Sequence, residues 1–292
     1  MAATGDAIGI IGGSGVYDID GFEDAEWQTV ETPFGAPSDA MLQGTLDGQR
    51  LVFLPRHGRG HRVPPSELNF RANIDALKRA GCSQVISVSA VGSLKEELSP
   101  GTFVLVDQFI DRTFARVKSF FSSGMVGHVS MAHPVCGRLG EHLMRGAAEA
   151  GVSMVRGGTY LVMEGPQFST LAESELYRSW GCDVIGMTNM PEAKLSREAE
   201  MCYATVAMVT DYDCWREETE AVDLAQVVEQ MQRNAKLARE VIETFCKNLP
   251  KKRTPSPIDQ ALSDAVITAP DRHDKALLAK LDAVAGRLLK SG

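Results

Sequence analysis

Apolar residues occur in short runs separated by segments rich in glycine and proline, and this pattern predicts alternating strands and helices. Short apolar runs bounded by turn residues predict strands at 8–11, 84–91, 103–109, 157–163, 184–187 and 203–210. Alternation around Asp47-Gly48 predicts a hairpin over 44–54. Apolar positions at helical spacing predict helices over 66–80, 135–150, 171–180, 193–200 and 224–248. The alternation predicts an α/β fold whose helices cover a central, largely buried sheet.

The C-terminal region differs in pattern from the rest of the chain. The basic, proline-rich segment PKKRTPSP at 250–257 predicts an extended connection. We therefore expect a main domain of residues 1–249 and a tail of residues 250–292. Apolar tail residues at helical spacing predict a helix that packs either on its own domain or on a neighbouring subunit, and they are Leu277, Leu281, Val284, Leu288 and Leu289.

Composition narrows the class of protein. With 292 residues, 44% apolar and 23% charged, the chain suits a soluble globular protein with one large core. No apolar stretch is long enough to cross a bilayer, and the first residues lack the basic and apolar regions of a secretory signal, so we expect a cytoplasmic protein. The net charge of −8 disfavours nucleic acid as a partner. The six cysteines form no CxxC pair, and those in apolar runs (Cys82, Cys182 and Cys202) are expected to be buried.

The first candidate site is the turn Gly12-Gly13-Ser14-Gly15 after the first strand. Glycines there let backbone N–H groups approach an anion, and the Ser14 hydroxyl adds a donor. The pattern matches neither the dinucleotide-binding GxGxxG motif nor a P-loop. A phosphate-binding turn and a purely structural turn both remain open.

The second candidate is the loop PRHGRGH at 55–61, which follows an apolar strand. The guanidinium of Arg56 presents a fork of donors suited to phosphate, and His57 can donate one more hydrogen bond. A structural basic turn is the alternative. A metal site on His57 and His61 is disfavoured because no acidic third ligand lies nearby, so we expect no metal.

Two further turns carry polar side chains. Glu164, before Pro166, could accept hydrogen bonds from ribose hydroxyls, and Phe168 could contact a sugar or a base. At the next strand end, Met187 could form an apolar wall and Thr188 could donate to phosphate. The alternatives are a core turn for the first segment and a helix cap for Thr188.

Asp211 and Asp213 follow the last predicted strand directly. Adenine needs a proton at N7 as it leaves and an acceptor for its amino group, and a carboxyl group can supply both. A solvated acidic turn or a helix cap is the alternative.

Taken together and in this order, eight segments resemble the trimeric purine nucleoside phosphorylase family, in particular its branch acting on methylthioadenosine. They are GIIGGSG (9–15), TPFGAPSDA (32–40), PRHGRGH (55–61), ISVSAVGSL (86–94), DQFIDRT (107–113), MEGPQFST (163–170), MTNMPEA (187–193) and TDYDCW (210–215). The resemblance covers roughly residues 8–248. It implies a central mixed β-sheet or distorted barrel flanked by helices, and a homotrimer with its active site near a subunit interface.

The resemblance also implies roles for individual residues. Phosphate, a co-substrate in an enzyme without a cofactor, would bind Ser14, Arg56, His57, Ser89, the backbone at Ala90, and Thr188. The nucleoside would contact Met187, Phe168 and Ser169, with Asp211 and Asp213 on the adenine. The methylthio pocket would be lined by Leu224, Val227 and Val228, and His128 would reach into a neighbour's pocket. Ser89 stands where this branch often has threonine, which keeps the hydroxyl.

The implied reaction is phosphorolysis of 5′-methylthioadenosine to adenine and 5-methylthioribose-1-phosphate, in purine and methionine salvage. Enzymes acting on 6-oxopurines place Asn at the position of Asp211, so the carboxylate favours adenine. A methylthioinosine phosphorylase and a non-catalytic nucleoside-binding protein remain open as well. From the sequence we further expect that replacing Arg56 abolishes turnover with little loss of fold, and that the apolar segment 120–131 marks a subunit interface.

Overall fold

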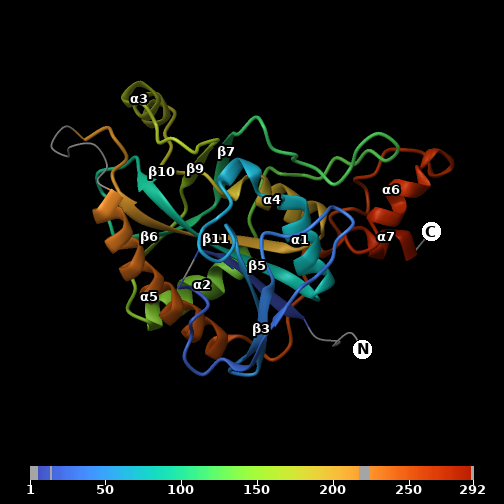
Figure 1. Cartoon of the computed structure of the whole chain (residues 1–292), viewed down its shortest axis with the longest axis horizontal. Coiled ribbons are helices and arrows are strands. Elements are labelled where there is room, and N and C mark those ends of the chain that lie inside the picture. The colour runs from blue at the N-terminus through green and yellow to red at the C-terminus, as the bar shows by residue number, and fades with distance from the viewer. Residues whose placement is uncertain (1–5, 14, 217–223, 291–292) are drawn as a thin grey trace.

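The computed structural model describes residues 6–13, 15–216 and 224–290, without the side chains of residues 224–227 and Lys290. The described strands form one mixed, branched sheet (Figure 1): β1 (Ala7–Gly12), β2 (Glu23–Gln28), β3 (Met41–Leu46), β4 (Gln49–Pro55), β5 (Cys82–Ser93), β6 (Phe103–Val106), β7 (Gln108–Arg112), β8 (Met154–Arg156), β9 (Thr159–Met163), β10 (Val184–Gly186) and β11 (Cys202–Asp211). The described α-helices are α1 (Phe70–Arg79), α2 (Gly137–Glu149), α3 (Leu171–Ser179), α4 (Asn189–Glu198), α5 (Leu224–Asn248), α6 (Lys275–Lys280) and α7 (Gly286–Lys290). Short 3-10 turns lie at Pro65–Glu67, Pro257–Gln260 and Pro270–Arg272.

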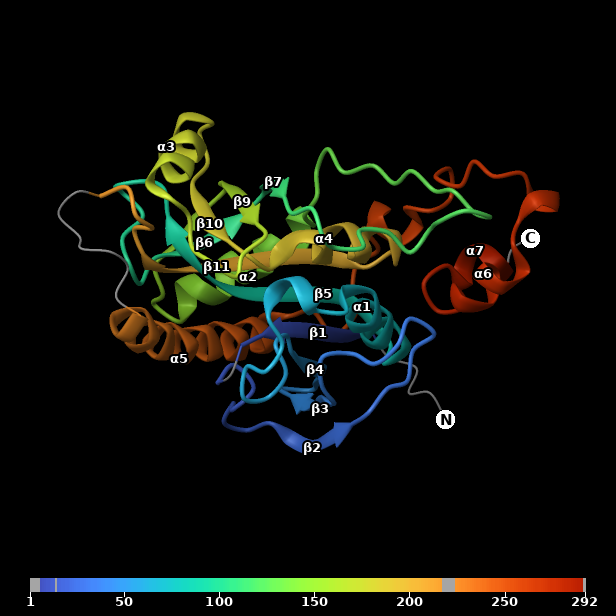
Figure 2. The same cartoon turned by 45° about the horizontal axis from the view of Figure 1, so that its top comes forward.

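Two apolar cores lie on opposite faces of the sheet, because side chains of the central strands alternate in direction. In β1, Ile8 and Ile10 join the core that packs against α2 and α5, whereas Ala7 and Ile11 join the core that packs against α1 and α4. Figure 2 shows α5 and α4 on opposite sides of β11. The α/β class with a mixed sheet flanked by helices is confirmed, and so is the burial of Cys82, Cys182 and Cys202.

The longest strand, β5, changes neighbours part-way along one of its edges. One edge pairs with β11 from Gln84 to Gly92. The other edge pairs with β1 as far as Ser87, and with β10 only from Gly92 onward. On that edge, residues 88–91 therefore have no strand partner within the described chain, and the loops that follow β1 and β10 meet at the gap.

Most predicted elements are confirmed, and the exceptions have local causes. The hairpin over 44–54 and the helix over 224–248 are present. The first helix begins later than predicted because the side chain of Asn69 caps it, accepting from the Ala72 N–H. The predicted strand over 103–109 is wrong: it is divided into β6 and β7 at Asp107, whose N–H donates to Gly158. The edge strand β2 was missed, because all six of its residues are exposed and show no apolar pattern.

The C-terminal tail packs on its own chain. Instead of the single predicted helix it forms α6 and α7, and Leu281, Val284 and Ala285 are fully or almost fully buried in the core beside α1 and α4. Arg287 forms an ion pair with the buried carboxylate of Glu200 at 2.6 Å. Of the two alternatives for the apolar residues of the tail, packing on their own domain is therefore the one observed. The domain boundary near residue 250 stays a prediction.

The segment between β7 and α2 lies along the tail (Figure 2). Gly127 forms a bridge with Val266, and Phe120 and Met125 are completely buried in the chain's own core. The apolar character of residues 120–131 is thus explained largely by packing within one chain, and it is no longer an argument for an interface. Within the residues described, no helix is both long enough and apolar enough to cross a bilayer.

A buried carboxyl group fastens this segment to α4. Glu198 accepts hydrogen bonds from the Ser119 hydroxyl and the Phe120 N–H, both at 2.7 Å. Burial raises the pKa of Glu198 from 4.5 to about 7, although these two donors oppose the shift.

Replacing Glu198 by Gln should change how stability depends on pH. The raised pKa means that the folded protein binds this proton more tightly than the unfolded chain. The stabilisation is complete below about pH 4.5 and is lost as pH rises towards 7, by roughly 3 kcal/mol at most. Urea unfolding at fixed protein concentration should show Glu198→Gln gaining stability relative to wild type over this interval. The exposed Glu175→Gln is the control, and parallel pH profiles for wild type and Glu198→Gln would contradict the prediction.

Candidate active site

A cavity of about 430 Å³ opens at the gap along β5. The strands β1, β4, β5 and β11 run parallel, so their carboxyl ends meet here, as is usual for ligand sites in α/β sheets. Residues 88–92 of β5 form part of the wall. The strands β9, β10 and β11, the loops around the cavity and α5 supply the rest: Gly13, Val16, Arg56, His57, His61, Pro65, Met163, Phe168, Ile185, Gly186, Met187, Thr188, Met208, Thr210, Asp211, Asp213, Val228, Met231, Gln232 and Ala235.

Arg56 is buried, lines the cavity and is held mainly by protein acceptors. Its Nε donates to Glu192 at 2.6 Å, and Nη2 donates to the Ser87 hydroxyl and the Ile11 carbonyl. Nη1 donates to the Val88 carbonyl at 2.9 Å. These contacts leave one Nη1 hydrogen for a ligand, since that nitrogen has a single acceptor among the described residues.

Glu192, on α4, is a residue of the site that the sequence reasoning missed. Its carboxylate is 1% exposed and accepts from Arg56, from the Ser87 hydroxyl at 2.9 Å and from the Tyr203 hydroxyl at 3.0 Å. The amide of Asn189 donates to the same Tyr203 hydroxyl. The charge of Arg56 is therefore neutralised inside the protein. The available signal was that Glu192 lies within the conspicuous segment MTNMPEA.

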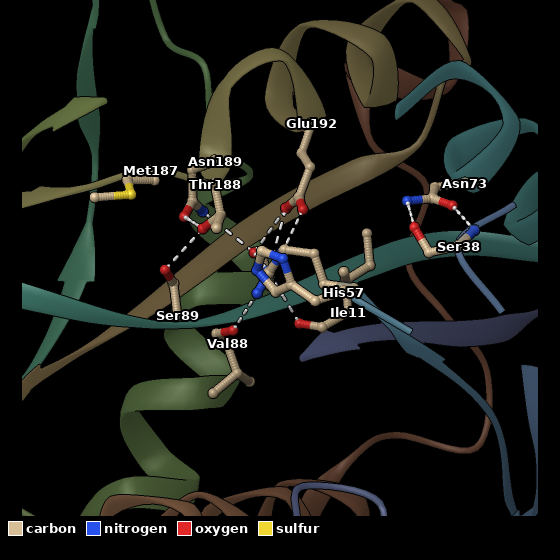
Figure 3. Close-up of polar contacts among 12 residues, drawn as sticks. Ile11, Ser38, His57, Asn73, Val88, Ser89, Met187, Thr188, Asn189 and Glu192 are labelled. Carbon is tan, nitrogen blue, oxygen red and sulfur yellow. Dashed lines mark hydrogen bonds and ion pairs between the residues drawn. The ribbon is translucent and has the colours of Figure 1, made fainter. Parts of the chain in front are cut away.

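Two hydroxyl groups predicted to bind phosphate are brought together. The hydroxyls of Ser89 and Thr188 lie 2.8 Å apart, although the residues are far apart in sequence (Figure 3). Thr188 precedes α4, yet its side chain makes no capping hydrogen bond, so the alternative of a side-chain cap is wrong. The Val88 carbonyl faces Arg56 at the gap. Because backbone groups two residues apart in a strand point the same way, the N–H of Ala90 also faces the gap.

His57 lines the cavity as a neutral imidazole. Its Nδ1 lies 2.9 Å from the Val63 carbonyl, and a carbonyl only accepts, so Nδ1 carries the proton. Burial, and then the positive charge of Arg56, lower the pKa of His57 to about 4. Its ring stacks on that of His61 with centroids 4.3 Å apart. Nowhere in the described residues do three or more His, Cys, Asp or Glu side chains group to hold a metal ion.

Asp211, the last residue of β11, and Asp213, two residues further on, both line the cavity. The Asp213 N–H donates to the Asp211 carboxylate at 2.8 Å, which folds the chain so that the two carboxyl groups converge. Burial raises the pKa of both groups, and the charge of Asp211 adds to the shift of Asp213. A Cβ atom at Gly92 would lie 3.0 Å from the Asp211 carboxylate, so glycine leaves room for the pair.

The hypothesis that Glu164 accepts from ribose hydroxyls is wrong. Its carboxylate is already bound by the Ser66 hydroxyl, the backbone N–H groups of Phe114 and Ala115, and Arg116, and it does not line the cavity. Together these groups hold its pKa at about 2 despite burial. Arg116 also donates to the Met187 carbonyl at 2.7 Å. Glu164 thus helps to position the loop that carries Met187.

The remaining predicted residues divide into three groups. Phe168, Met187 and Val228 line the cavity, whereas Ser169 does not line it, and its side chain forms a hydrogen bond with Asp213. His128 is exposed, does not line this cavity, and its N–H donates to the Ala265 carbonyl at 2.8 Å. The described part of the structure does not include Ser14 or the side chains of Leu224 and Val227. Reasoning from the sequence also missed Met231, Gln232 and Ala235 of α5, which line the cavity; of these, Met231 and Ala235 continue the apolar spacing of the helix.

Comparison with known proteins decides the family. The phosphorylase superfamily matches residues 7–247 of this chain. The chain belongs to this superfamily. It is 60% identical to the S-methyl-5′-thioadenosine phosphorylase of Rhodospirillum rubrum over 284 residues, covering 97% of each chain. It is 54% identical to the protein of the same name from Koribacter versatilis, covering 96% of each.

Solved structures agree with this membership of the phosphorylase superfamily. A methylthioadenosine phosphorylase from an Antarctic soil metagenomic library has a TM-score of 0.91 and 43% identity, covering 97% of this chain and 99% of the other. The Schistosoma mansoni methylthioadenosine phosphorylase in complex with adenine has a TM-score of 0.83 and 36% identity, covering 89% and 98%. The fold is therefore that of the superfamily.

Replacing Arg56 should cost stability as well as activity, contrary to the expectation from sequence. Arg56→Ala leaves the buried Glu192 carboxylate without its partner, which should lower the free energy of unfolding by about 3–5 kcal/mol. The double variant Arg56→Met/Glu192→Leu should recover most of that stability in urea unfolding. Arg59→Ala, which breaks an exposed ion pair in the same loop, should change it little. An unchanged unfolding midpoint for Arg56→Ala would show that the pair does not hold the fold.

Proposed function

We propose that this chain catalyses the phosphorolysis of 5′-methylthioadenosine to adenine and 5-methylthioribose-1-phosphate. The proposal rests chiefly on one observation: a cluster of hydroxyl groups and a pair of carboxyl groups face the same cavity from two positions along β5. Ser89 carries one of the hydroxyl groups, and Gly92 lies against the carboxyl groups. Ser89 and Gly92 are three residues apart in β5, which separates the two sets of groups by about 10 Å along the strand. This separation suits a ribose held between phosphate and base. The names of the relatives support the same substrate.

Phosphate would bind at the gap in β5. Its donors would be the hydroxyls of Ser89 and Thr188, the Ala90 N–H and the remaining Nη1 hydrogen of Arg56. As the glycosidic bond stretches, positive charge develops on the ribose, and the fixed phosphate stabilises that charge before it attacks C1′. No cofactor is needed for this step, because phosphate is a co-substrate.

Adenine would bind at the two carboxyl groups. Burial raises the pKa of Asp211, which favours its protonated form and lets it give a proton to N7 as the base leaves. Asp213 would accept from the amino group. The 5′-methylthio group would lie against α5, where Val228 and Met231 form an apolar wall. Burying one additional apolar group there contributes about 1 kcal/mol.

The homotrimer also belongs to the proposal. Phe114 is 83% exposed and Val117 is 57% exposed, and the Phe114 N–H bonds to Glu164 beside the loops that form the cavity. Large apolar side chains at such exposure suit a subunit interface next to the active site. The same assembly would bring His128 of a neighbouring copy towards this cavity. The cytoplasmic location and the role in purine and methionine salvage are predictions that accompany it.

A product assay tests the function directly. Adenine should be released from 5′-methylthioadenosine only when inorganic phosphate is present, and 5-methylthioribose-1-phosphate should form in equal amount. Nucleoside binding without phosphate-dependent release would instead favour the non-catalytic alternative. Equal turnover of methylthioinosine would favour the 6-oxopurine alternative.

Asp211→Asn tests the assignment of base recognition. Loss of the proton donor should lower kcat/KM for methylthioadenosine by about 10²–10⁴-fold. The ratio of kcat/KM for methylthioinosine to that for methylthioadenosine should rise by about tenfold or more, because an amide can donate to O6 where a carboxylate repels it. Asp107→Asn is the matched control, since Asp107 also follows a strand but lies outside the cavity. An unaltered ratio in Asp211→Asn would reject the assignment.

A further inference from the structure

The ring of His57 offers the cavity an acceptor and no donor. Its Nδ1–H is directed to the carbonyl of Val63, which does not line the cavity. One ring face is stacked on His61. The edge that carries Nε2 remains, and no residue in the described part of the chain forms a hydrogen bond with it. Because a neutral imidazole carries one proton, the Nε2 atom presents a lone pair.

The surroundings of His57 keep the ring in this form. Burial is the main factor that disfavours a second proton on the ring, and the charges of Arg56, His61 and Arg116 act in the same direction, against the opposing hydrogen bond to the Val63 carbonyl. The buried carboxylate of Glu192 is paired with Arg56. The base of the cavity therefore combines neutral hydroxyl and backbone donors with a neutral acceptor, rather than a free positive charge.

An oxyanion that suits this set of groups must itself carry a hydrogen. Monohydrogen phosphate has three oxygens that only accept and one P–OH group that can donate. Sulfate has the same shape and charge at neutral pH but carries no hydrogen, so one of its oxygens would meet the Nε2 lone pair. Two acceptors that face each other in a closed site without a hydrogen between them are unfavourable.

We propose that Nε2 of His57 accepts a hydrogen bond from the P–OH group of monohydrogen phosphate, so that His57 selects phosphate over sulfate. The inference rests on the proposed function, because it assigns this end of the cavity to phosphate. Arsenate is protonated like phosphate at neutral pH and should be accepted in its place. Selection therefore depends on the hydrogen carried by the anion and not on its charge or size.

The test compares oxyanions on the wild-type enzyme. We would measure the KM for phosphate, the KM for arsenate and the inhibition constant of sulfate competing with phosphate. The wild-type enzyme should bind sulfate about tenfold or more weakly than phosphate, the factor expected for one unsatisfied hydrogen bond. Equal affinity for the two anions would overturn the inference without any variant.

His57→Gln provides the second measurement. Its amide can place either an N–H or a C=O near the position of Nε2, so the preference for phosphate over sulfate should fall by about tenfold or more. The ratio of the arsenate KM to the phosphate KM should stay constant. His133→Gln, which changes an exposed imidazole outside the cavity, should keep the wild-type preference for phosphate over sulfate. A preference that persists in His57→Gln would overturn the role of His57.

The outcomes separate this inference from the function on which it rests. Absence of any phosphate-dependent adenine release from the wild-type enzyme would refute the proposed function and this inference with it. Phosphate-dependent release combined with unselective binding of sulfate would refute only the role of His57.

Discussion

The buried ion pair between Arg56 and Glu192 holds together the strand ends that form the cavity. Arg56 follows β4 and also donates to Ile11 of β1 and to Val88 of β5, while Glu192 lies on α4. A guanidinium group is suited to this position because its donors leave in several fixed directions. Burying two charges is costly, and the surrounding hydroxyls offset part of that cost by completing the hydrogen bonds of the carboxylate.

This pairing has a consequence for the proposed phosphate site. Because Arg56 is neutralised by Glu192, a dianion at the gap in β5 would be held mostly by uncharged donors fixed on rigid elements. Such donors need little rearrangement as charge develops on the sugar. At the other end of the wall, burial of Asp211 without a cationic partner in the described chain raises its pKa, which suits a group that must carry a proton. The two ends therefore differ in charge compensation, and that difference supports the proposal that phosphate binds at one end and the base at the other.

The sequence by itself determined the class of fold and identified several of the residues that line the cavity. Apolar residues repeating every two or every 3.6 positions, and short apolar runs, were sufficient to predict the hairpin, the buried strands and α5. They were sufficient because the spacing of apolar residues reflects which faces of an element are buried. The polar segments that follow the strands could also be recognised in the sequence. Parallel strands place their carboxyl ends at the same edge of a sheet, so these segments were expected to lie together. Arg56, His57, Thr188 and Asp211 were found in this way, and all four line one cavity.

Only the tertiary structure decided what those residues bond to. Arg56 and Glu192 are 136 positions apart, and no local pattern shows that they neutralise each other. Glu164 looked available from sequence, yet four separate groups already bind its carboxylate. The tautomer of His57 depends on a carbonyl that the loop brings back to it. Hydrogen-bond partners and charge compensation are set by contacts across the chain, whereas local spacing reports only which side of an element is buried.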